Sequence, residues 1–71
     1  MQQIQRQLGD RIRKLRQKKG WSQEEFAAIS GLHRTYVGAV ERGEKNLTIS
    51  SIHTLAKTLG TTISALFQRI A

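Results

Sequence analysis

The chain has 71 residues and a net charge of +7, with 12 Lys and Arg residues against 5 Asp and Glu residues. This length fits one small domain, assigned to residues 1–71, and the positive charge favours a polyanionic partner, nucleic acid first and an anionic membrane surface second. The absence of cysteine excludes disulfides, thiolate metal sites and cysteine nucleophiles, and it fits a reducing, cytoplasmic setting.

The first predicted helix covers residues 3–19 and carries seven of the cations. Apolar residues recur along it every three or four positions, which is the spacing of one helix face. These residues are Ile4, Leu8, Ile12 and Leu15. Lys18 and Lys19 suit the last turn of a helix, where the helix dipole favours positive charge, and Gly20 follows as the predicted stop.

The second predicted helix begins after a capping box and ends near Ser30. The Ser22 hydroxyl is expected to accept the N–H of Glu25, whose carboxylate reaches back to the backbone of Ser22. Trp21, before the cap, and Phe26, inside the helix, have the spacing of a hydrophobic staple. The two patterns together indicate a short helix with a well-defined start.

Three further helices follow. The third covers about residues 34–42, presents Val37 and Val40 to a core and ends at Gly43. The fourth is capped by Thr48, with Leu47 and Ile52 as a staple, and stops at Gly60. Its predicted buried residues are Ile49, Ile52, Leu55, Ala56 and Leu59.

Thr62 is the predicted cap of the last helix, which carries four apolar residues. They are Ile63, Leu66, Phe67 and Ile70. No stretch alternates apolar and polar residues beside a hairpin turn, so strands are not expected. The sequence therefore predicts an all-α fold, a compact bundle of five helices.

Residues 22–43 have the organisation of a helix-turn-helix, because two short helices are joined by three or four residues that include Gly31. With Val37 and Val40 directed to the core, several residues of the second helix are expected to face outward. They are Arg34, Thr35, Tyr36, Gly38 and Ala39. A helix of this size fits the major groove of DNA, where such side chains meet the base edges.

The run LGDRIRKLRQKKGWSQEEFAAISGLHRTYVGAVERGEKNLTISSIHTLAKTLGTTISALF resembles the Cro/Xre-type helix-turn-helix domain of phage and bacterial repressors. The resemblance covers about residues 8–67 and is carried by IRKLR, SQEEFA, YVGAVERG and LAKTLG. The segment GLHRTYVGAVERGEKNLTI is also similar to controller proteins of restriction–modification systems, which are small dimeric regulators.

The resemblance implies a role for particular residues. The base-contacting positions of the family fall on Arg34, Thr35, Tyr36 and Ala39. The phosphate-binding positions fall on Gln23, Arg42, Lys45, Asn46 and Thr48, with His33 as a further candidate. Arg16 and Glu41 match a family pair that forms a largely buried ion pair, which implies a structural role.

Two positions depart from the family pattern. His33 stands where Ser or Thr usually caps the recognition helix, and because histidine is not a preferred cap, its side chain is expected to reach a phosphate instead. Ile29 stands where the family more often has a polar residue, so the edge of the core is expected to leave it partly exposed.

We interpret the chain as a homodimeric, sequence-specific regulator of transcription that binds a pseudo-palindromic operator in double-stranded DNA. A domain this small has apolar residues to share with a second copy, and the candidate dimer contacts are Ile63, Phe67 and Ile70. An antitoxin that also binds a toxin protein is the alternative function. A protein partner recovered from the native host would distinguish the antitoxin.

Other classes of function find little support. His33 and His53 lack a carboxylate or thiol to complete a metal site, and no serine has a His–Asp partner at workable spacing. No apolar run approaches the roughly 20 residues that span a bilayer, and no signal peptide opens the chain. We therefore expect no catalysis, metal, cofactor, membrane or small-molecule ligand.

Overall fold

The computed structural model describes residues 2–70, and side chains from residue 3 onward. It contains α1 (Gln2–Lys18), α2 (Gln23–Ser30), α3 (Arg34–Glu41), α4 (Ile49–Leu59) and α5 (Ile63–Leu66). Within residues 2–70 there is no strand, so the predicted all-α fold with five helices is confirmed.

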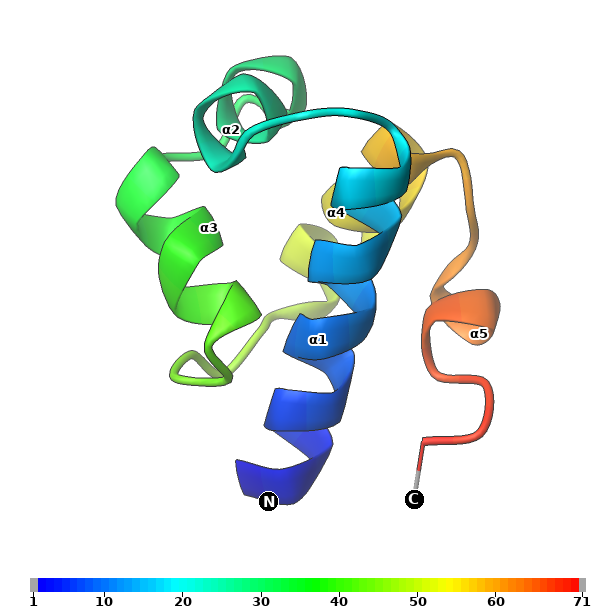
Figure 1. Cartoon of the computed structure of the whole chain (residues 1–71). Helices are drawn as coiled ribbons and strands as arrows, with labels where there is room; N and C mark the ends of the chain where they lie inside the picture. Colours follow the sequence, from blue (N-terminus) through cyan, green and yellow to red (C-terminus); the bar gives the residue numbers. More distant parts are fainter. Residues whose placement is uncertain (1, 71) are drawn as a thin grey trace.

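α1 runs through the middle of the bundle (Figure 1). α2 and α3 lie to one side of it and α5 to the other, while α4 packs behind it. α1 contacts α3, α4 and α5, and α2 contacts α3 and α4. α1 thus separates the helix-turn-helix pair from the C-terminal segment.

Each helix contributes one side chain to the centre of the core. All five are less than 2% exposed, and they are Ile12, Phe26, Val37, Leu55 and Leu66. Burying an aliphatic or aromatic side chain of this kind stabilises a fold by about 1.5–3 kcal/mol. Because each of the five side chains comes from a different helix, displacing any one helix would expose part of the core.

The predicted start of α2 is present in detail. The Ser22 hydroxyl accepts the N–H of Glu25 at 3.0 Å, and the Glu25 carboxylate accepts the N–H of Ser22 at 2.8 Å. The rings of Trp21 and Phe26 stack with centroids 6.0 Å apart. Thr48 and Thr62 cap α4 and α5 as predicted, since each side chain accepts a backbone N–H three residues later.

Three sequence predictions about the core and helix ends need correction. Ile49 is 73% exposed, because it is the first residue of α4 and precedes the turn that packs on the core. α3 ends at Glu41, with Arg42 as its cap. α5 ends at Leu66, and the chain leaves helical geometry before Ile70, as the positive φ of 65° at Arg69 shows. Ile29 is exposed, as expected.

Gly9 allows the backbones of α1 and α3 to approach closely. A Cβ atom built on Gly9 would lie 2.3 Å from the carbonyl oxygen of Val40 and 2.8 Å from that of Glu41. Since these are backbone atoms, no rotamer change relieves the clash. This close approach at Gly9 was not predicted from the sequence.

Candidate nucleic-acid interface

The conformation of the turn between α2 and α3 is fixed by the C-terminal cap of α2 and the N-terminal cap of α3. Gly31 has φ 75°, a left-handed conformation that glycine adopts without strain, and its N–H donates to the Ala27 carbonyl. At the other end, Nδ1 of His33 accepts the N–H of Thr35 at 3.2 Å. The prediction that His33 does not cap α3 is therefore wrong. A neutral imidazole nitrogen supplies the lone pair that a Ser or Thr hydroxyl would otherwise supply.

A buried ion pair fixes α3 against α1, as the family resemblance implied. Nε of Arg16 lies 2.7 Å from Oε2 of Glu41, and Nη2 lies 2.9 Å from Oε1. The two side chains are 10% and 2% exposed. Nη1 of Arg16 also donates to the carbonyl of Trp21 at 2.7 Å, so the guanidinium holds the segment before the Ser22 cap of α2 in the same cluster.

Gln23 connects the start of α2 to this ion pair. Its Nε2 donates to Oε1 of Glu41 at 3.0 Å. The Glu41 carboxylate therefore receives bonds from α1 and from α2 while it sits at the end of α3. As a result, the position of Gln23 relative to α3 is fixed before any ligand is bound.

Polar side chains from α2, α3 and the residue after α3 surround a hollow, called here the α2–α3 hollow. It has a volume of about 240 Å³ and is lined by Gln23, Arg34, Thr35, Gly38 and Arg42. A Cβ atom at Gly38 would lie 3.2 Å from Nη1 of Arg42 and 3.5 Å from Oε1 of Gln23. The missing side chain of Gly38 thus keeps the hollow open. Arg34 and Thr35 are exposed beside it.

Part of the predicted outward face of α3 is covered. Ala39 is 8% exposed and Gly38 is also buried, so the prediction that both face outward is wrong. Because α3 packs against both α1 and α2, much of its surface is covered. The side chain of Ala39 is a single methyl group, which is too short to extend beyond the neighbouring side chains. Tyr36 is half-buried and packs against the core, which leaves Arg34 and Thr35 as the exposed pair.

The candidate phosphate-binding residues do not all lie together. Lys45 and Asn46 line a second hollow, beside the N-terminal part of α1, and Gln5 donates to the Asn46 side chain there. The Thr48 hydroxyl is used by the α4 cap, where it accepts the N–H of Ser51 and donates to its hydroxyl. Of the six candidates, only Gln23 and Arg42 line the α2–α3 hollow.

Two further findings bear on other kinds of site. Within the described residues, no three His, Cys, Asp or Glu side chains come together as a metal site would require. Across residues 2–70, no helix is long and apolar enough to cross a membrane.

Sequence reasoning missed the part played by Gly38 in the hollow. Glycine in the middle of an eight-residue helix lowers helix stability, and this unfavourable placement is the signal that could have marked it. The same signal applies to Gly9 in α1.

Comparison with known proteins identifies the relatives of this chain. Residues 12–66 match the helix-turn-helix family HTH_3. The chain is 48% identical over 62 residues to control protein C.SmaI of Serratia marcescens, which covers 87% of this chain and 74% of the relative. It is 38% identical over 71 residues to control protein C.MunI of a Mycoplasma species, covering 99% and 96% of the two chains.

Solved structures of controller proteins are also similar to this chain. The crystal structure of the restriction–modification controller protein C.AhdI from Aeromonas hydrophila matches with a TM-score of 0.83 and 47% identity, over 87% of this chain and 94% of that one. The C.Esp1396I controller tetramer, solved in complex with its natural 35-base-pair operator, matches with a TM-score of 0.83 and 34% identity, over 94% and 88% of the two chains. This chain therefore belongs to the Cro/Xre-type helix-turn-helix family, as a relative of restriction–modification controller proteins.

Proposed function

We propose that this protein is a sequence-specific regulator of transcription that binds double-stranded operator DNA as a homodimer and has no catalytic activity. The observation that carries the proposal is the α2–α3 hollow, where hydrogen-bond donors and two guanidinium groups meet beside the exposed start of α3. Two of its relatives are named control proteins, and the similar C.AhdI structure is named a restriction–modification controller protein, which supports the same role for this chain. Such a regulator works in the cytoplasm, where bacterial DNA lies.

Arg34 and Thr35 are the proposed base-contacting residues. Both lie in the first turn of α3 and are exposed. An arginine fork can donate to O6 and N7 of guanine, and a threonine can offer its hydroxyl to a base or its methyl group to thymine. Tyr36 is proposed to contribute its exposed edge, while the buried Ala39 contributes shape alone.

Gln23 and Arg42 are the proposed phosphate contacts at the edge of the hollow, and Lys45 and Asn46 extend the contact along the strand. Gln23 is the first residue of α2, so a phosphate there also meets the free N–H groups of the helix N-terminus. His33 is proposed to contribute through Nε2, since Nδ1 is used in capping.

A homodimer would contact more base pairs than a single copy of this small domain. One recognition helix contacts only a few base pairs, and dimers join two half-sites about one helical turn apart. We propose that Ile63, Phe67 and Ile70 make the dimer contact, because all three are only partly buried while they pack on the core. The C.Esp1396I controller is a tetramer on its operator, which supports the proposal that this chain also binds DNA as an oligomer.

Selection of bound sequences from a random duplex pool tests the proposal. We expect enrichment of a pseudo-palindrome, with a plot of log K against log salt that falls by roughly 0.9 for each phosphate neutralised. Arg34→Ala should reduce the preference for the selected sequence. Lys57→Ala removes the same charge from an exposed position in α4 and serves as the control. No enrichment, together with a nearly flat salt dependence, would contradict the proposal.

A further inference from the structure

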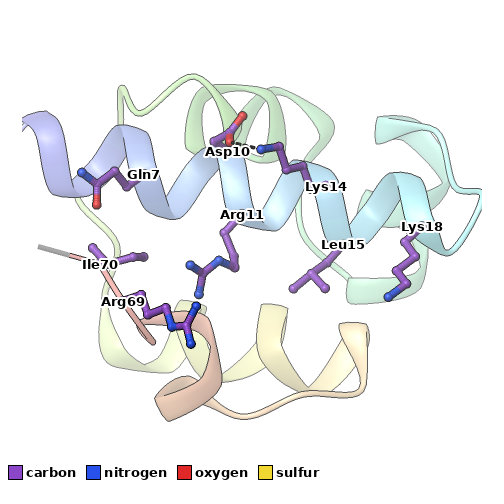
Figure 2. Close-up of a pocket in the computed structure, with 8 residues that line it drawn as sticks. All are labelled: Gln7, Asp10, Arg11, Lys14, Leu15, Lys18, Arg69 and Ile70. Atoms are coloured by element: carbon purple, nitrogen blue, oxygen red, sulfur yellow. Dashed lines mark ion pairs between the residues drawn. The ribbon is translucent and has the colours of Figure 1, made fainter.

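A further cavity lies on the other side of α1 from α3, between α1 and the segment that follows α5. It has a volume of about 420 Å³, within the range of sites that bind small molecules. Figure 2 shows the side chains that line it, which come from one face of α1 and from the two residues Arg69 and Ile70. We call it the α1–C-terminal cavity.

Four of the eight residues that line the cavity are cations. Arg11, Lys14 and Lys18 come from α1, and Arg69 comes from the C-terminal segment. The guanidinium groups of Arg11 and Arg69 both point into the space between the two segments (Figure 2). Leu15 and Ile70 supply an apolar part of the lining. The positive charges that converge on this cavity repel each other, and a bound anion would offset this electrostatic repulsion.

Arg11 is held in place by the protein and still has donors to offer. Its Nη1 donates to the carbonyls of Ala65 and Leu66, at 3.1 and 3.2 Å, where α5 ends. Within residues 3–70, its Nε and Nη2 have no hydrogen-bond partner, and neither Arg69 nor Lys18 has one. The fork of Arg11 is therefore oriented in advance for an anion.

Among the described residues, the carboxylate that lines the cavity is Asp10, and it pairs with only one of the four lining cations, Lys14. Asp10 is paired with Lys14 at 3.1 Å and with Arg13, at the edge of the cavity (Figure 2). The hydrogen bond from Lys14, aided by the nearby Arg13 guanidinium, lowers the pKa of the Asp10 carboxyl. Asp10 thus stays ionised at neutral pH, with its charge directed at Lys14 and Arg13 rather than at Arg11, Lys18 or Arg69.

The position of the cavity separates it from the candidate DNA interface. α1 lies between α3 and the C-terminal segment, so a duplex docked on the exposed start of α3 would leave the cavity open (Figure 1). A concave site with several converging cations and an apolar wall suits a compact, multiply charged anion better than an extended strand. Arginine forks match phosphate oxygens in particular.

We propose that the α1–C-terminal cavity binds a small phosphate-bearing anion, with Arg11, Lys18 and Arg69 on the phosphate groups and Leu15 against any organic part. Such a ligand joins α1 to the C-terminal segment. This site is additional to the proposed DNA interface, and its occupancy does not depend on which DNA sequence the protein binds.

The test is titration of the full chain with pyrophosphate and, separately, with ADP, followed by the backbone amide signals in NMR spectra. We expect saturable shifts for residues that line the cavity, with dissociation constants below about 1 mM. Arg69→Gln and Lys18→Gln should each weaken binding about tenfold, as loss of a charge-assisted hydrogen bond does. Lys57→Gln, with the same loss of charge on α4, should change it less than twofold.

The two probes distinguish two sources of the same chemistry. Tighter binding of ADP would identify an organic phosphate that also contacts Leu15, and equal binding would identify free phosphate groups as the ligand; both support the site. Shifts scattered over all basic surfaces, or equal weakening by Lys57→Gln, would reduce the effect to general attraction by a +7 chain and overturn the proposal. Cavity shifts caused only by duplex DNA would also overturn it.

Discussion

Replacing Arg16 with alanine would remove the cation that pairs with the Glu41 carboxylate, whose side chain is 2% exposed, and leave Gln23 as its remaining side-chain partner. A neutral amide supplies one hydrogen bond but no charge. Breaking a buried ion pair in this way costs about 3–5 kcal/mol of folding free energy. A chain of this size has a total stability of about 4–10 kcal/mol, so Arg16→Ala should remove a large part of it.

Urea unfolding followed by circular dichroism measures the effect. With a slope near 1 kcal/mol per molar urea, which is usual for a small domain, the midpoint should fall by about 3–5 M. The double variant Arg16→Met/Glu41→Leu removes both charges and should lose less stability than Arg16→Ala alone. If Arg16→Ala shifts the midpoint by less than about 1 M, Glu41 reaches water in the variant, and the argument from burial is refuted.

The remaining predictions concern packing, recognition and assembly. Gly9→Ala should destabilise the fold by about 1–3 kcal/mol, because its Cβ meets backbone carbonyls of α3, and thermal unfolding would show this as a Tm lower by several degrees. Arg34→Ala should cost about 1–3 kcal/mol per half-site on the selected operator and much less on random DNA, by fluorescence anisotropy. Lys45→Ala should weaken binding to both DNAs alike and make the salt slope shallower by about one unit per subunit. Ile70→Glu should shift sedimentation toward the monomer, and a wild type that is already monomeric at micromolar concentration would contradict the dimer assignment.

The helix starts could be predicted because their signals are local. The Ser22 and Glu25 side chains bond to backbone groups three residues away, so sequence spacing contains the whole interaction. The partners Arg16 and Glu41 are 25 positions apart, and no local spacing joins them. Only the family resemblance predicted that pair.

Burial on α3 could not be predicted from periodicity, because a period of 3.6 residues places side chains around a helix but does not say how many neighbours cover it. Two helices pack against α3, so Ala39 is covered although it lies beside the exposed positions. Ile49 shows the reverse case, since an apolar residue in the first turn of α4 has no neighbour to cover it. The cap at His33 depends on which ring nitrogen is unprotonated, which the sequence does not specify.

The contacts around Glu41 explain how a small chain can hold the candidate DNA interface in a fixed geometry and still leave the Arg42 side chain free to change partners. The buried carboxylate binds Arg16 and Gln23, which fixes the start of α2 against the end of α3. Arg42, the next residue, pairs with Glu44 at 3.1 Å, and both of those side chains are more than half exposed. Exposed pairs contribute little to stability, about 0–1 kcal/mol. Arg42 can therefore exchange Glu44 for a phosphate at small cost, while the buried pair beside it keeps the α2–α3 hollow in place.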